Sequence, residues 1–287
     1  MNRADDVDAT VMKAVRQSLL KIGIVGFGGV GRQVAERLLR GDLPGATLVA
    51  VSSRNIEKAR GSLDSMGGSV VSVCSLADMA EHADLIVECA TADAFPEIAE
   101  TVLSAGKILV AVSVAALPNY PGLADLARHH GGRIHVASGG LPGLDAVRAV
   151  REGHIESIKL RTTFRPESLA SEPFVRDLGF DFTVPPSRAV QVFAGNAREA
   201  GAAFPRHFNV GITLSLAGIG FDDTAIEVWV DPDVEGAVQH IEVKADIADL
   251  SLISRNRPSQ NPRTSRIVAP SIMATLRGYV DAVHVGT

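Results

Sequence analysis

The chain has 287 residues, of which 46% are hydrophobic and 21% charged, and its formal net charge is −5. This composition is typical of a soluble globular protein and argues against a disordered, collagenous or coiled-coil chain. Since one domain has roughly 150 residues, the length predicts about two domains. The negative charge gives no sign of a nucleic-acid partner or of binding to an anionic membrane surface.

Neither a leader nor a membrane span is expected. The longest apolar run, Ile108–Leu117, is too short to cross a bilayer, and no long apolar stretch follows the acidic N-terminal residues. Two cysteines, Cys74 and Cys89, cannot build a disulfide framework and fit a reducing compartment. We therefore expect a cytoplasmic protein.

The first part of the chain predicts a parallel sheet. Residues 1–20 read as a polar extension with amphipathic helical spacing. Short apolar segments and helical segments then alternate as far as residue 138, which indicates a doubly wound α/β sheet of the Rossmann type. The expected strands are 21–25, 47–51, 70–73, 84–88, 107–112 and 133–136, and the expected helices are 29–40, a segment from 55, one near 76, 94–105 and 122–130.

The pattern changes after Gly139, where longer alternating stretches predict an α+β region with an antiparallel or mixed sheet. The segment Glu167–Ser187 lacks periodicity and is expected as a long irregular loop, either beside a binding site or as a surface excursion. The expected strands here are 157–164, 225–230, 238–244 and 251–254, and the expected helices are 144–151, 197–203 and 264–277.

A glycine-rich turn joins the first strand to the first helix of the predicted sheet. Gly26-Phe-Gly28-Gly29-Val30-Gly31 matches the pattern GxGxxG. In such a turn the first glycine allows a sharp bend, the second lets the backbone approach a pyrophosphate, and the third permits close helix–strand packing. The helix N-terminus adds free N–H groups and a partial positive charge. This context predicts dinucleotide binding by Gly26, Gly28, Gly29, Val30 and Gly31.

The end of the second strand indicates which dinucleotide is bound. NAD-specific sites place Asp or Glu about 20 residues beyond the glycines, on the ribose 2′-hydroxyl. This chain has Ser52-Ser53-Arg54 there and no carboxylate. Because a hydroxyl and a guanidinium suit a 2′-phosphate, Ser53 and Arg54 favour NADP over NAD. The alternative is that Arg54 stacks on the adenine or faces solvent.

Several ordered motifs resemble the L-aspartate dehydrogenase family between about residues 21 and 276. One is Ser138-Gly-Gly140-Leu-Pro-Gly-Leu-Asp145, which is similar to SGAxxGLDA. Others are Val87-Glu88-Cys-Ala90, Phe204–Val210 with Asn209, Asp231-Pro232, and Asn261-Pro-Arg-Thr-Ser265. Such a likeness is far more specific than the glycine turn alone.

The resemblance implies reversible NAD(P)-dependent oxidative deamination of L-aspartate to oxaloacetate and ammonia through iminosuccinate. It implies a Rossmann domain at 21–138, a mixed-sheet substrate and dimerisation domain at 139–261, and a C-terminal helix in 262–287 that returns to the Rossmann domain. It places Ala90, Gly140 and Asn209 on the coenzyme, with glycine at 140 where the family has alanine, and it makes a homodimer the default assembly.

One departure from the family lies at its catalytic histidine, in the pattern NxHxI. An ungapped alignment puts Gln239 at that position and His240 one residue later. Glutamine can orient a carbonyl or a water, but it cannot exchange a proton near neutral pH. Since neighbouring strand residues face opposite ways, His240 could act as acid–base only if a bulge after Gly236 re-aimed it. Otherwise His240 is a structural or surface histidine.

A second departure is Phe164-Arg165 in a normally basic stretch, which puts aspartate in doubt and makes a less charged oxo substrate plausible. Candidate carboxylate clamps are Arg165 and Arg263, and a second candidate proton donor is His207. We expect no metal site. The rival functions are reduction of a different imine or carbonyl by the same fold, or dinucleotide binding without turnover.

Overall fold

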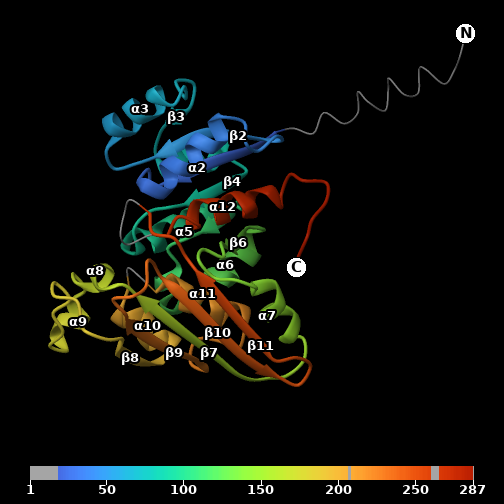
Figure 1. The fold of residues 1–287 in the computed structure, drawn as a ribbon. Helices are drawn as coiled ribbons and strands as arrows, with labels where there is room; N and C mark the ends of the chain where they lie inside the picture. Colours follow the sequence, from blue (N-terminus) through green and yellow to red (C-terminus); the bar gives the residue numbers. More distant parts are fainter. Residues whose placement is uncertain (1–18, 206–207, 260–264, 287) are drawn as a thin grey trace, which may run out of the picture.

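The computed structural model describes residues 19–205, 208–259 and 265–286. Its first sheet has six strands in the order β3-β2-β1-β4-β5-β6, and every neighbouring pair is parallel (Figure 1). This confirms the doubly wound parallel sheet. The strands are β1 (Leu20–Val25), β2 (Ala46–Ser52), β3 (Ser72–Val73), β4 (Leu85–Glu88), β5 (Ile108–Ala111) and β6 (Arg133–Val136).

Helices cover both faces of this sheet, and alternate strand residues point to each layer. In β4, Leu85 and Val87 belong to one buried cluster while Ile86 belongs to the other. The first layer consists of α2 (Gly29–Leu39), α3 (Ile56–Ser65) and α12 (Val268–Arg277). The second consists of α4 (Leu76–His82), α5 (Phe95–Ser104) and α6 (Leu123–His130), with the 3-10 turns η1 (Ala92–Ala94) and η2 (Val114–Asn119) nearby.

The second sheet is mixed, which confirms the expectation for this half of the chain. Its order is β11-β10-β7-β9-β8, and only the β7–β9 pair is parallel. The strands are β7 (Ile155–Phe164), β8 (Val190–Asn196), β9 (Thr224–Val230), β10 (Val238–Ala245) and β11 (Leu250–Arg255). Its inner face packs on α10 (Ala197–Ala203) and α11 (Asn209–Ala217), and α7 (Leu144–Val150) packs on α11.

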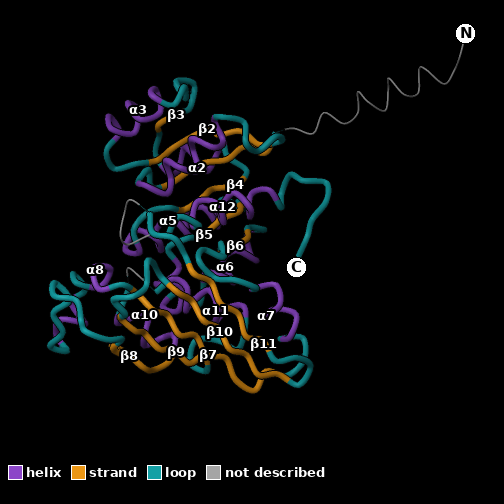
Figure 2. The backbone as a smooth tube through the Cα atoms, viewed as in Figure 1, coloured by secondary structure: helices purple, strands orange, loops and turns teal. Residues whose placement is uncertain are grey.

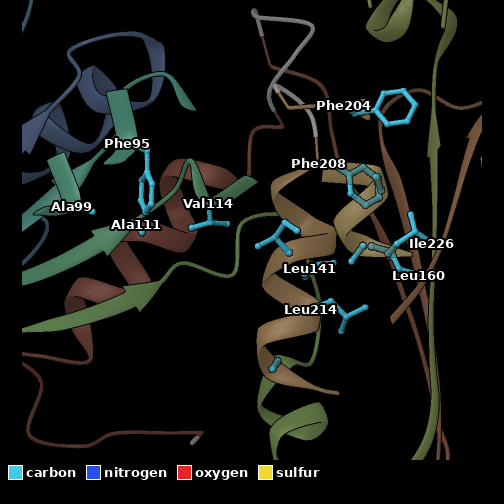
Figure 3. Close-up of a cluster of buried hydrophobic side chains, with 14 of the residues drawn as sticks. Phe95, Ala99, Ala111, Val114, Leu141, Leu160, Phe204, Phe208, Leu214 and Ile226 are labelled. Carbon is cyan, nitrogen blue, oxygen red and sulfur yellow. The ribbon is translucent and has the colours of Figure 1, made fainter. Parts of the chain in front are cut away.

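One continuous apolar core joins the two sheets. Phe95 and Val114 from the first sheet's layer belong to the same buried cluster as Leu160 and Ile226 of the second sheet. Figure 3 shows these residues with Leu141 and Leu214, which lie between the two sides. Because the shared core holds the two halves together, it also holds the walls of any cavity between them.

Three local features differ from the sequence expectations (Figure 2). Strand β8 was not predicted, because a register shift between Gln191 and Phe193 breaks its alternation. Helix α11 is buried along almost its whole length and has no polar face to reveal a helical period. The segment 167–187 contains two short helices, α8 (Pro166–Leu169) and α9 (Pro173–Asp177), each started by a proline in its first turn.

The first and last described elements, β1 and α12, lie in the first sheet and in one of its helical layers. The strand expected from Lys21 begins at Leu20, and most of the proposed 1–20 extension lies outside the described residues. Helix α12 begins at Val268 and packs on α2, so the C-terminal part of the chain lies against the first sheet (Figure 1). In the described ranges, no helix is both long and apolar enough for a membrane crossing.

Candidate active site

A cavity of about 330 Å³ lies where the carboxyl ends of β1, β4, β5 and β6 meet the inner face of the second sheet. Ligands of doubly wound sheets bind at this point, where the strand order reverses. The described lining residues are Gly29, Val30, Cys89, Ala90, Val112, Ser113, Ala137, Ser138, Gly139, Gly140, Phe164, Asn209, Val210, Thr213, Ala237, Gln239, Asn256, Ser265 and Val268.

The glycine turn at the cavity edge has the geometry that a phosphate needs. Gly26 has a φ of +89°, and a Cβ there would lie 2.5 Å from the backbone of Cys89 and Ala90. A Cβ on Gly31 would overlap the carbonyl oxygen of Gly26, so α2 packs directly under the turn. Positions 28 and 29 face open space at the start of α2. The turn therefore fits a pyrophosphate at the helix N-terminus.

Ser53 and Arg54 follow β2, on the neighbouring strand of the same sheet edge. The Ser53 hydroxyl accepts a hydrogen bond of 3.4 Å from the Asn55 amide. Arg54 is exposed, and within the described ranges no carboxylate forms an ion pair with it. Its guanidinium is therefore available to an anion at this edge.

Two amide side chains from the second half shape the opposite wall. Asn209 Oδ1 accepts a hydrogen bond of 2.9 Å from the backbone N–H of Ala115, which ties α11 to the turn after β5. Asn256 Nδ2 donates to the carbonyl oxygen of Gly140 at 3.1 Å. A Cβ at position 140 would lie 2.9 Å from that Nδ2 atom, so Asn256 packs closely against the glycine backbone.

Gln239 projects into the cavity from β10 and is only 3% exposed. Its Oε1 accepts a hydrogen bond of 2.7 Å from the buried hydroxyl of Thr162, which lies opposite it on β7. Among the described residues, none accepts a hydrogen bond from Gln239 Nε2. Because the Gln239 side chain lines the cavity, this N–H group is available to a ligand there. The arrangement offers a neutral, oriented hydrogen-bond donor to a ligand.

His240 lies on the other face of the second sheet. The β10 register is regular from Val238 to Val243 against both neighbours, so there is no bulge to re-aim His240. Its Nε2 lies 3.4 Å from Ser251 Oγ and 3.8 Å from Glu242 Oε1. The condition under which His240 would act as acid–base is therefore not met, and His240 occupies the alternative position of a surface histidine.

The other side chains that the sequence suggests for substrate binding or proton transfer are Arg165, Arg263 and His207. Arg165 precedes α8 with its Nε 3.8 Å from Glu167 Oε2, and it is not among the described lining residues. Arg263 and His207 lie outside the described residues. The cavity does bring together Gly29, Val30, Ala90, Gly140, Asn209 and Gln239.

Sequence reasoning missed several polar lining residues, notably Ser113, Thr213 and Asn256. Ser113 could have been found from its place just after a predicted strand of the parallel sheet, whereas Thr213 lies on the unpredicted α11. Cys89 is the one titratable side chain in the described lining. Burial, with the adjacent Glu88 carboxylate, raises the pKa of its thiol well above the usual range, so the thiol stays protonated.

Comparisons with known proteins agree with this geometry. Residues 26–137 match the family model described as "Homoserine dehydrogenase, NAD binding domain", and residues 145–279 match "Aspartate dehydrogenase, C-terminal". The chain is 41% identical to L-aspartate dehydrogenase 3 of Bordetella bronchiseptica over 270 residues, which cover 93% of this chain and 98% of that one. It is 36% identical to L-aspartate dehydrogenase of Methanocaldococcus jannaschii over 277 residues, covering 94% and 100% of the two chains.

Solved structures share the fold. Aspartate dehydrogenase from Thermotoga maritima superposes with a TM-score of 0.68 at 20% identity, covering 93% of this chain and 99% of that chain. Scyllo-inositol dehydrogenase from Lactobacillus casei, solved with bound NAD(H) and scyllo-inositol, superposes with a TM-score of 0.54 at 15% identity, covering 92% and 88%.

Proposed function

The chain belongs to the L-aspartate dehydrogenase family, and on that premise we propose that it converts L-aspartate to oxaloacetate and ammonia. It is an NAD(P)-dependent oxidoreductase acting on an amino group. In the proposed reaction a hydride leaves Cα, a proton leaves the nitrogen to solvent, and water then hydrolyses iminosuccinate. The observation that carries the proposal is the cavity that joins the glycine turn to Gln239.

A nicotinamide dinucleotide supplies the hydride acceptor when it is bound. We assign its pyrophosphate to the turn formed by Gly26, Gly28, Gly29, Val30 and Gly31, which is open at the start of α2. Deeper in the cavity, Ala90, Gly140 and Asn209 are assigned to the rest of the coenzyme. With these assignments, we propose that residues 21–138 form the coenzyme domain, residues 139–261 the substrate domain, and residues 262–287 a C-terminal segment.

NADP is the proposed preferred coenzyme. Arg54 is exposed at the end of β2, beside the Ser53 hydroxyl, where a 2′-phosphate would extend from the adenosine ribose. A guanidinium binds phosphate with a fork of charge-assisted hydrogen bonds. The lack of an acidic residue at Ser52-Ser53-Arg54 removes the usual acceptor for the ribose hydroxyl of NAD.

Gln239 is proposed to hold the substrate against the coenzyme. Its Nε2 group can donate to a substrate oxygen, while Thr162 keeps its Oε1 engaged. Since an amide does not titrate near neutral pH, Gln239 orients the reacting carbon, and the proton from the substrate nitrogen passes to solvent. Arg165 and Arg263 stay candidate clamps for the substrate carboxylates.

A second candidate function is reduction of a less charged imine or carbonyl with the same coenzyme. It is favoured by the apolar ring of Phe164 and the neutral amide of Gln239, which both line the cavity. The two functions differ in the charge of the substrate, which is a dicarboxylate in the first and less charged in the second.

We further propose a cytoplasmic homodimer. The outer face of the second sheet carries an ordered network in which Lys159, Arg161 and Trp229 bind Glu227, and the Arg161 guanidinium lies 5.2 Å from the Trp229 ring centre. Ile253 on β11, which β10 separates from β7, is 48% exposed. A rigid face that combines an aromatic residue, arginine and an exposed isoleucine suits a subunit interface. Sedimentation analysis of the full chain tests the dimer.

The function is tested by incubating the protein with L-aspartate and NADP⁺ or NAD⁺ and measuring reduced coenzyme, oxaloacetate and ammonium together. The proposal expects the three products in equal amounts. A protein that oxidises hydroxy acids instead, without releasing ammonium, supports the second candidate. Coenzyme binding without turnover on any substrate supports a binding protein without catalysis.

A further inference from the structure

A buried carboxylate lies directly behind the coenzyme cavity. Glu88, the last residue of β4, is fully buried. Its Oε1 accepts a hydrogen bond of 2.7 Å from the Ala90 amide, and its Oε2 accepts bonds of 3.1 and 2.8 Å from the amides of Val112 and Ser113. In the described part of the chain no basic side chain forms an ion pair with it. Backbone N–H groups, with the nearby Ser113 side chain, thus hold the carboxyl group.

A buried carboxyl group of this kind does not favour folding by itself. Burial raises the pKa of Glu88, and the three backbone N–H groups oppose that rise only in part. An ionised carboxylate without a cationic partner carries a large desolvation penalty, and an apolar residue would avoid it. The position of Glu88 calls for a role that depends on its ability to accept several hydrogen bonds at once.

The groups that Glu88 binds belong to two separate loops. Ala90 follows β4 and Ser113 follows β5, and both residues line the cavity. The Ser113 hydroxyl also donates to the Ala90 carbonyl at 2.8 Å, so the two loops are joined twice. By accepting hydrogen bonds from both loops, Glu88 holds them at a fixed distance from each other.

The same loops contact the rest of the coenzyme site. Gly26 of the phosphate turn packs on the backbone of Cys89 and Ala90 so closely that no Cβ would fit. Two residues beyond Ser113, the Ala115 amide donates to Asn209 Oδ1 on α11. A continuous set of contacts therefore runs from Glu88 to the phosphate turn on one side and to the second half of the chain on the other.

We propose that Glu88 is a positioning residue, which holds the loops after β4 and β5 at the spacing that admits the nicotinamide end of the coenzyme. It acts through backbone amides and does not touch the reacting atoms. The inference rests on the proposed coenzyme site. It makes coenzyme affinity, rather than folding, the property that depends on Glu88.

The test is the variant Glu88→Gln, compared with Glu97→Gln, an exchange on the neighbouring helix α5. The amide keeps the side chain's shape but turns one acceptor into a donor that faces backbone N–H groups. At a temperature well below both Tm values, the Kd for NADPH should rise by roughly tenfold or more, as expected for losing a hydrogen bond to a charged group. The Kd for ADP-ribose phosphate, which lacks nicotinamide, should change far less, and Glu97→Gln should leave both unchanged.

A lower Tm with an unchanged NADPH Kd would overturn the inference, because Glu88 would then serve folding only. Equal losses of affinity for NADPH and for ADP-ribose phosphate would also contradict it. If Glu88→Gln does not fold, Glu88→Asp is the second variant, because its shorter side chain keeps the carboxyl group but cannot reach both loops: weaker NADPH binding supports the inference and unchanged binding opposes it. Failure of the unaltered protein to bind any dinucleotide contradicts the proposed function itself.

Discussion

Thr162 and Gln239 lie opposite each other on the antiparallel strands β7 and β10, and the Thr162 hydroxyl donates a 2.7 Å hydrogen bond to Gln239 Oε1. Both side chains are buried on the sheet face that meets the cavity. The bond determines which end of the carboxamide faces a ligand. Gln239 is thus presented to the cavity as an oriented donor and not as a proton carrier.

Replacing Thr162 with valine should weaken catalysis, because Gln239 Oε1 loses its donor and the amide can turn. We expect kcat to fall by roughly three- to tenfold, corresponding to about 0.5–1.5 kcal/mol for one hydrogen bond. The coenzyme Kd should be unchanged. Steady-state kinetics and coenzyme titration check this result, with Thr163→Val, on the opposite sheet face, as the matched control. An unchanged kcat in Thr162→Val would show that the orientation of Gln239 is unimportant.

Replacing Gln239 with histidine should introduce a new pH dependence. A neutral amide cannot titrate, whereas imidazole has an ordinary pKa of about 6.5. The kcat/KM profile of Gln239→His should therefore gain an inflection near that pH that the unaltered protein lacks, together with higher activity on aspartate. His240→Ala should leave the profile of the unaltered protein as it is, since His240 faces away from the cavity. A profile that changes in His240→Ala would return the acid–base role to that residue.

Replacing Arg54 with alanine should change coenzyme preference. The guanidinium is exposed beyond β2, where it can bind a 2′-phosphate but has nothing to bind on NAD. We expect the Kd for NADPH to rise by roughly 10- to 100-fold, as for hydrogen bonds to a charged group, with little change for NADH. Parallel titrations with the two coenzymes measure this. Equal losses for both would mean that Arg54 stacks on the adenine.

Replacing Glu227 with glutamine should lower the stability of the folded protein near neutral pH but not in strong acid. Burial opposes ionisation of this carboxyl, but hydrogen bonds from Lys159, Trp229 and Arg161 outweigh it and lower the pKa from 4.5 to about 2. The folded state therefore holds the proton less tightly than the unfolded chain, and the resulting stabilisation is present above pH 4.5 and lost as the pH falls towards 2.

The Tm of Glu227→Gln should accordingly be lower than that of the unaltered protein near neutral pH, and the difference should shrink as the pH falls below 4.5. Thermal unfolding across this pH range measures it. Glu235→Gln is the control, since Glu235 forms only an exposed pair with Arg257. A Tm difference that does not depend on pH would rule out the charge of Glu227 as its cause.

Local motifs made part of this site predictable from sequence. The glycine turn, Val87–Ala90 and the Ser138–Asp145 stretch are motifs of residues adjacent in the chain, so the sequence alone predicts Gly29, Ala90 and Gly140 as site residues, and all three line the cavity. Thr162 and Asn256 are not predicted, because their contacts join segments far apart in sequence, across strand pairs whose register no motif records. Helix α11 escaped prediction for a related reason: a helix buried on every side has no amphipathic period.

Amino-acid dehydrogenase chemistry in a cavity whose residue 239 is glutamine can be measured in the reverse direction. Oxidation of NADPH is measured with oxaloacetate in the presence and absence of ammonia, and again with NADH. The account predicts turnover that requires ammonia, forms aspartate and is faster with NADPH. Oxidation at the same rate without ammonia, or tight NADPH binding with no turnover, would contradict it.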